Sequence, residues 1–112
     1  VAAAATALLL EKMASPPSME ALVRHLGTNE KRLTEAFQEA FQLPVFGWLR
    51  EQRLKLSRQL LVQTDTPIAD IAAHCGYGSP ANFATAFKTR FECSPRDFRR
   101  QAAAYVQEDS PS

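Results

Sequence analysis

The chain has 112 residues, of which 46% are hydrophobic and 22% are charged; this suits one compact domain, or two very small subdomains that share a helix, and argues against wholesale disorder. No apolar run approaches the ~18 residues that span a membrane, and no basic region precedes the apolar segment 1–10, which disfavours a membrane protein and a signal peptide. Cys75 and Cys93 lack a CxxC pairing and the two histidines do not cluster, so we expect no metal and no cofactor.

The cysteines indicate a cellular compartment, and the first residue indicates a longer protein. Two such cysteines are typical of small apolar side chains in a reducing cytosol, so we expect a cytoplasmic protein; a disulfide or a redox sensor is the alternative. The chain does not begin with methionine, which is typical of a fragment. We expect a longer protein whose N-terminal effector or dimerisation domain is missing here.

Every predicted element is a helix, because no stretch alternates apolar and polar residues with period two. Proline and glycine divide the chain into segments, and small polar residues before most segments predict N-caps. In chain order we predict helices over 2–13, 19–26, 30–41, 45–62, 67–74, 80–91, and from 95 through Arg100 toward Tyr105. The predicted caps are Ser18, Thr28 or Asn29, Thr66 before Pro67, Ser79 before Pro80, and Ser94, which opens a capping box with Asp97.

A short pattern occurs twice in the chain. Each copy has a short helix, a turn with glycine (Gly27 or Gly76), and a second helix with apolar residues at i, i+4 and i+8, which is typical of a helix-turn-helix unit. Two such units predict a protein that reads two neighbouring stretches of DNA. The aromatic stripes are offset by 83 − 33 = 50 residues: Leu33, Phe37, Phe41 and Phe83, Phe87, Phe91. In the first copy we expect the buried set Leu33, Ala36, Phe37, Ala40 and Phe41.

The charge distribution also favours a nucleic-acid partner, although the net charge is only +1. Residues 46–64 carry four basic against one acidic side chain, net +3, and residues 76–100 carry five against two, also net +3. Residues 19–45 carry three against four, net −1. Because phosphate neutralisation supplies most non-specific affinity, we expect the middle helix and the second repeat to supply most sequence-independent binding.

The second repeat carries the most specific signature. Its turn, Gly76-Tyr77-Gly78-Ser79, together with the stripe that follows and with Ser94-Pro95 and Phe98-Arg99, resembles the AraC/XylS family of transcription regulators. Leu26-Gly27 and Trp48-Leu49 agree with that resemblance, which covers residues 8–100. It implies an all-α fold with two helix-turn-helix subdomains joined by one long helix. The implied organisation is a single DNA-binding domain over 1–112, with a first helix-turn-helix over 19–45, a linker helix over 45–62, and a second helix-turn-helix with the final helix over 66–100.

The resemblance also implies which side chains read bases in the major groove of double-stranded DNA. Periodicity agrees, because the implied positions lie off the two apolar stripes. The implied base-reading residues are Lys31, Thr34 and Glu35 in the first repeat and Pro80, Ala81, Asn82 and Thr85 in the second. Candidates for contact with phosphate are Gln38, Arg53, Arg58, Ser79, Lys88 and Arg96.

Three residues depart from the family pattern. Gln42 and Glu92 stand where glycine is common after each stripe, which predicts a less tight left-handed turn there. Pro80 stands where a polar reader is common and has no side-chain hydrogen bond to offer.

We therefore expect sequence-specific DNA binding by a bacterial transcription regulator, most simply an activator with RNA polymerase as a further partner. The alternatives are a helical protein-interaction module and the helical part of a DNA-repair enzyme. No catalytic residue is predicted, because neither cysteine has a neighbouring histidine or basic motif that would mark a nucleophile.

Overall fold

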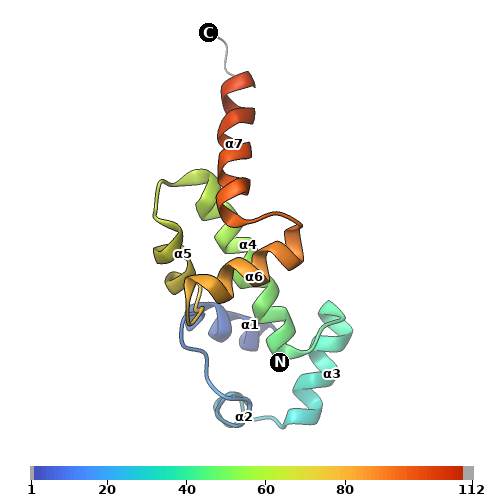
Figure 1. The fold of residues 1–112 in the computed structure, drawn as a ribbon. Coiled ribbons are helices and arrows are strands. Elements are labelled where there is room, and N and C mark those ends of the chain that lie inside the picture. Colours follow the sequence, from blue (N-terminus) through green and yellow to red (C-terminus); the bar gives the residue numbers. More distant parts are fainter. Residues whose placement is uncertain (1, 110–112) are drawn as a thin grey trace. The chain divides into compact units, whose positions relative to one another are not determined.

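The structure, a computed structural model, describes residues 2–109, with side chains described through Ala104. That part of the chain forms seven helices and no strand (Figure 1), which confirms the all-α prediction. None of these helices combines the length and the apolarity needed to cross a membrane. The helices are α1 (Ala2–Glu11), α2 (Met19–Leu26), α3 (Glu30–Phe41), α4 (Val45–Gln63), α5 (Ile68–His74), α6 (Pro80–Phe91) and α7 (Pro95–Asp109).

The chain divides into two compact units, which we call unit 1 (Val1–Arg53) and unit 2 (Leu54–Ser112). The boundary falls inside α4, so one helix contributes side chains to both cores. Unit 1 contains the first helix-turn-helix, α2 and α3, and unit 2 contains the second, α5 and α6.

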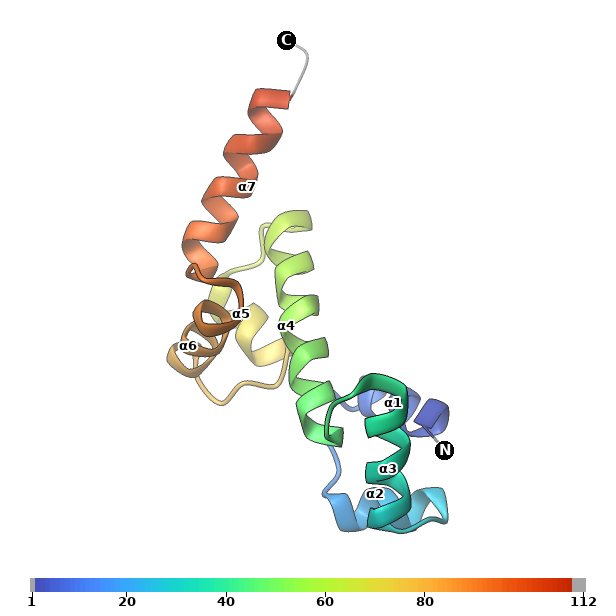
Figure 2. The same ribbon diagram turned by 90° about the vertical axis from the view of Figure 1, so that its right-hand side faces the viewer.

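Unit 1 is organised around α3. This helix contacts both α1 and α2 (Figure 2), and Leu9, Leu22, Leu33 and Phe37 are fully buried between them. The first turns of α4 complete the core with Trp48, whose ring meets that of Phe37 edge-on, with centroids 5.8 Å apart. Burial of each such side chain contributes about 1.5–3 kcal/mol, so the stripe holds α3 with one side toward the core.

Unit 2 is organised around α6 in the same way. This helix contacts α5 and α7, and Phe83 and Phe87 are fully buried. Phe87 meets Phe98 of α7 edge-on at 5.6 Å, and this pair corresponds to Phe37 and Trp48 of unit 1. Both cysteines take part in the apolar packing: the buried core cluster is Leu54, Leu61, Ile71, Ala72, Cys75, Phe83 and Phe87, and Cys93 packs against it.

Most predicted helix boundaries agree with the structure, and α2, α3 and α6 have the predicted bounds. α1 ends earlier than predicted, α4 ends one residue later, and α7 continues further. The predicted cap Thr66 is wrong, because α5 begins at Ile68 with Pro67 as its N-cap and without a side-chain cap. The Thr66 hydroxyl instead forms a hydrogen bond with the Thr64 hydroxyl, with the two oxygens 3.0 Å apart. These two threonines close the turn after α4, so Thr66 is not available to α5.

The prediction of a less tight turn after each apolar stripe, at the ends of α3 and α6, is also wrong. Gln42 has φ 60° and ψ 31°, and Glu92 has φ 66° and ψ 13°, so both are left-handed. Their N–H groups donate to the carbonyls of Gln38 and Lys88, at 2.9 and 2.8 Å. These hydrogen bonds close the helix ends, and the two residues keep the conformation that glycine would adopt at a cost in backbone strain.

The buried stripe of α3 is shorter than predicted. Leu33 and Phe37 are fully buried, whereas Phe41 is 37% exposed and Ala40 is exposed. In α6 the last member of the stripe, Phe91, is half-buried. In both helices the last turn extends past the core, so the third aromatic ring of each stripe lies at the surface.

Candidate nucleic-acid interface

A glycine turn joins the two helices of each helix-turn-helix. In unit 1, Gly27 has φ 68°, and the N–H of Thr28 donates to the carbonyl of Val23 at 3.0 Å. In unit 2, the glycine before Tyr77 has φ 90°, and the N–H of Tyr77 donates to the carbonyl of Ala72 at 2.9 Å. Bonds of this kind satisfy the last carbonyls of a helix. Both first helices therefore end in the same way, and each second helix starts after a fixed change of direction.

The first set of predicted readers shares one exposed side of α3. Asn29 starts this helix by accepting a hydrogen bond from the N–H of Arg32 at 2.9 Å. Since Leu33 and Phe37 are fully buried, the opposite side of α3 faces solvent. The exposed side carries Lys31, Thr34, Glu35 and Gln38. A lysine can donate to guanine O6 or N7 and a carboxylate can accept from cytosine N4, so this side is able to distinguish base pairs.

The second set shares one exposed side of α6. Ser79 is the N-cap, and its hydroxyl oxygen accepts a hydrogen bond from the N–H of Asn82 at 3.1 Å. The proline that follows fits the first helical position, where no N–H is needed. Asn82 can pair with adenine N6 and N7, and the others offer small apolar or hydroxyl contacts. The exposed residues are Pro80, Ala81, Asn82, Thr85 and Lys88.

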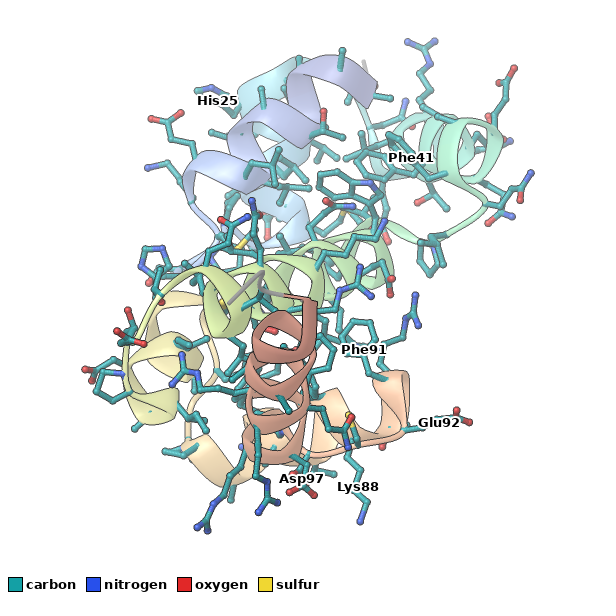
Figure 3. The ribbon with its side chains drawn as sticks, turned by 90° about the horizontal axis from the view of Figure 1, so that it is seen from above. His25, Phe41, Lys88, Phe91, Glu92 and Asp97 are labelled. Carbon is teal, nitrogen blue, oxygen red and sulfur yellow. The ribbon has the colours of Figure 1, made fainter. Side chains whose placement is uncertain are left out.

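The predicted phosphate candidates are placed differently from one another. Gln38, Lys88 and Arg96 are exposed, and Figure 3 shows Lys88 pointing away from the ribbon. Arg58 is exposed and has its guanidinium over the ring of Phe91. Ser79 is half-buried and serves as the cap of α6.

Two arginines have structural hydrogen bonds that the sequence did not indicate. Arg53 donates from Nε and Nη2 to the carbonyl of Met13, at 3.2 and 2.8 Å. Arg99 donates from Nε to the carbonyl of Leu61 at 3.0 Å and from Nη2 to that of Thr64 at 3.2 Å. Both guanidinium groups thus bind the last carbonyls of a helix or the turn after it, where positive charge is favourable. Their charges were counted with the DNA-binding charge, yet they support the fold.

Two further arginines form ion pairs. Arg24 is paired with Glu20 at 3.0 Å, and Arg100 is paired with Asp97. Hydrogen bonds from Arg100 and from Ser94 lower the pKa of the Asp97 carboxyl below its ordinary value. The N–H of Asp97 donates to the Ser94 hydroxyl at 3.1 Å, so Ser94 caps α7 as predicted.

These exposed sides offer hydrogen-bond donors, acceptors and charge. In the part of the chain that the structure describes, no group of three or more His, Cys, Asp or Glu side chains could hold a metal ion. One basic side chain that the sequence analysis counted but did not name as a candidate, Arg90, lies beside Phe91 with Cζ 4.9 Å from the ring centroid. Its position in the last turn of the predicted reader helix was the signal that could have identified it.

Comparisons with known proteins agree with this geometry. Residues 22–101 match a family model described as a helix-turn-helix domain. The "HTH-type transcriptional activator RhaS" of Salmonella schwarzengrund is 31% identical over 101 residues, which are 90% of this chain and 36% of that protein. The chain spans between 19% and 36% of the length of the first curated relatives that it matches.

Solved structures show the same fold. An AraC-type transcriptional regulator from Chromobacterium violaceum superposes with a TM-score of 0.82 at 27% identity, covering 91% of each chain. The DNA-binding domain of AdpA, solved in complex with a target DNA, superposes with a TM-score of 0.81 at 24% identity, covering 96% of this chain and 94% of that one. With two helix-turn-helix units that share one long helix, the chain belongs to the AraC/XylS family of transcription regulators and is a DNA-binding domain of that family.

Proposed function

We propose that this chain binds double-stranded DNA sequence-specifically, by inserting α3 and α6 into major grooves, as part of a bacterial transcription activator. The observation that carries the proposal is the matched exposure of the two second helices. Each buries its apolar stripe and exposes residues at equivalent helical positions, which are Lys31, Glu35 and Gln38 in α3 and Ala81, Thr85 and Lys88 in α6. A helical adaptor protein would have no need for such matched exposed positions, and a repair enzyme would need a reactive group that neither cysteine provides.

The proposed base contacts divide between the units. In unit 1, Lys31, Thr34 and Glu35 read bases and Gln38 contacts the backbone. In unit 2, Asn82 makes the most discriminating contact, because it alone among the exposed residues there can form a bidentate pair with adenine. Pro80, Ala81 and Thr85 add apolar and hydroxyl contacts, while phosphate is bound by Arg58, Ser79, Lys88 and Arg96. Arg53 is left out of this set, because its guanidinium is bound to the carbonyl of Met13.

The proposal extends to the longer protein. Its relatives are considerably longer than this chain, and one of them carries the name of an activator. We propose that the rest of the protein supplies an effector or dimerisation domain, that the DNA-bound protein contacts RNA polymerase, and that it acts in the bacterial cytoplasm without catalysing a reaction. The domain organisation over 19–45, 45–62 and 66–100 is part of this proposal.

Selection of bound sites from a random duplex pool tests the proposed function. We expect an asymmetric site, because the two reader sets differ and a monomer with unlike readers does not favour a palindrome. Readers in successive major grooves would lie roughly 34 Å apart, so the site should span about 20 base pairs. Enrichment of a strict palindrome bound by a dimer of this chain would contradict the proposal, and so would a pool without any enriched sequence.

A further inference from the structure

Two guanidinium groups, from two helices, lie over the ring of Phe91. The Cζ atom of Arg58, on α4, lies 4.7 Å from the ring centroid, and the Cζ atom of Arg90, on α6, lies 4.9 Å from it. Phe91 packs on the buried ring of Phe87, with centroids 4.7 Å apart. Figure 3 shows Phe91 directed toward α4 and Glu92 directed away from the ribbon. The core therefore fixes the ring, and the ring fixes where the arginine side chains lie.

This arrangement suits the binding of an anion. A guanidinium that stacks on an aromatic ring keeps its N–H donors at its edge, where they can form paired hydrogen bonds with a phosphate. An exposed arginine normally loses side-chain freedom when it binds, and a ring that already holds its guanidinium reduces that loss.

The position of the ring connects it with DNA. Phe91 is in the last turn of α6, and exposed Lys88 lies in the same turn. An α-helix with its side chains is roughly 10–12 Å wide and the major groove is about 12 Å wide. Groups beside an inserted helix or at its end therefore lie close to the sugar-phosphate backbone.

The first repeat does not carry the same pair of residues. With the offset of 50, Phe91 corresponds to Phe41 and Arg58 corresponds to Leu8. The Phe41 ring lies 5.3 Å from Phe37 and 5.4 Å from Trp48, centroid to centroid. The aromatic position is shared between the repeats, whereas the arginine across from it belongs to the second repeat.

We propose that Phe91 is a positioning residue that holds the guanidinium of Arg58 for contact with one phosphate of the DNA backbone. This inference rests on the proposed function, because it assumes that α6 enters the major groove. It assigns to an aromatic residue of the stripe a part in DNA binding that does not involve any base.

The test measures the affinity of the full 112-residue chain for a mixed-sequence 24-base-pair duplex at several salt concentrations. Arg58→Ala should lower the slope of log affinity against log salt by about 0.9, the value for one phosphate. Phe91→Leu should lower the slope by nearly as much although it removes no charge, whereas Phe91→Tyr should keep it. The double variant Arg58→Ala/Phe91→Leu should bind no more weakly than Arg58→Ala, because both changes remove the same contact.

Phe41→Leu is the matched control, since it removes the equivalent ring of the first repeat and should leave the slope unchanged. Thermal unfolding of each variant identifies any that is not folded at the binding temperature. If Phe91→Leu is not folded, Phe91→Tyr still tests the proposal, because it should keep the slope. An unchanged slope in Arg58→Ala would overturn the phosphate contact. A lowered slope in Arg58→Ala with a normal slope in folded Phe91→Leu would overturn the positioning role. Failure of the unaltered chain to bind any duplex would instead contradict the proposed function.

Discussion

The two helix-turn-helix units share a scaffold and differ in what surrounds it. Phe37 with Trp48 and Phe87 with Phe98 form the same edge-on pair at an offset of 50. Around the exposed ends of the stripes the units diverge: Phe41 lies against Trp48, whereas Phe91 lies against Arg58. The rings that orient α3 and α6 are therefore the same in both units. The two units differ in the residues at their surface.

The largest expected effect comes from the shared rings. Phe37→Ala and Phe87→Ala each remove a fully buried ring and should each cost about 3–5 kcal/mol of unfolding free energy. A unit of this size has only a few kcal/mol of stability to lose, so we expect each variant to unfold its own unit. Urea unfolding followed by circular dichroism measures the loss. A cost below ~1 kcal/mol in either variant would contradict the equivalence of the two cores.

The next largest effect is on base preference, and it distinguishes the exposed side of α3 from that of α6. Glu35→Ala and Asn82→Ala should each weaken binding to the selected site by about 1–3 kcal/mol and relax preference at different base pairs. Competition between the selected duplex and single-base variants of it measures both changes. Preference lost at the same base pairs in both variants would show that the two units do not read separate parts of the site.

A smaller effect tests the division of charge between the units. Lys88→Ala removes an exposed charge from α6 of unit 2 and should lower the salt slope on non-specific duplex by about one unit. Arg24→Ala removes a charge from unit 1 that is already paired with Glu20, so it should change the slope less. Fluorescence anisotropy titrations at several salt concentrations give both slopes. A larger change in Arg24→Ala would reverse the expected division.

The left-handed residues offer a matched pair of stabilising changes. Gln42→Gly and Glu92→Gly should each stabilise the chain by roughly 0.5–1 kcal/mol, because glycine adopts the observed φ without strain. Glu92→Gly should gain more, since it also removes an acidic side chain from the C-terminal end of a helix. Thermal unfolding measures both gains, and Glu92→Gln isolates the contribution of the charge. Destabilisation by either glycine would mean that the side chain there makes a contact worth more than the strain.

The smallest effect concerns the capped start of α7. Because the pKa of Asp97 is lowered in the folded state, its contribution is present above the ordinary carboxyl pKa and is lost as pH falls through the lowered value. Asp97→Asn should therefore reduce stability slightly at neutral pH and show a smaller loss on acidification than the unaltered chain. The first repeat has Leu43 where the second has Ser94, at an offset of 51, so no equivalent pH effect is expected from the start of α4. Equal pH profiles for variant and unaltered chain would contradict this assignment.

Periodicity and capping chemistry were enough to predict most of the fold. The bounds of α2, α3 and α6 follow from Ser18, Asn29 and Ser79, whose side chains make local bonds that depend on neighbouring residues only. The tight left-handed conformation of Gln42 could not be predicted, because residue preferences assign positive φ to glycine and Gln42 adopts it nonetheless. The exposed sides of α3 and α6 could be predicted from their apolar stripes. Contacts between residues far apart in the sequence could not be predicted in this way.

The arginines illustrate that limit most clearly. A count of charges assigns Arg53 and Arg99 to DNA, while the structure shows their guanidinium groups bound to carbonyls 40, 38 and 35 residues away. Only the tertiary structure brings these groups together, so no local pattern distinguishes such an arginine from one that contacts phosphate.

Those two arginines also determine how a comprehensive mutational scan of this chain should look. Substitutions at Arg53 and Arg99 remove donors from helix ends, so variants at both positions should accumulate poorly in cells even when no operator is present. Substitutions at Lys88 should leave cellular abundance intact and lower reporter output alone. A scan scored on both quantities would therefore sort the basic residues into two phenotypic classes, and the class of each arginine would follow from whether its guanidinium binds a backbone carbonyl.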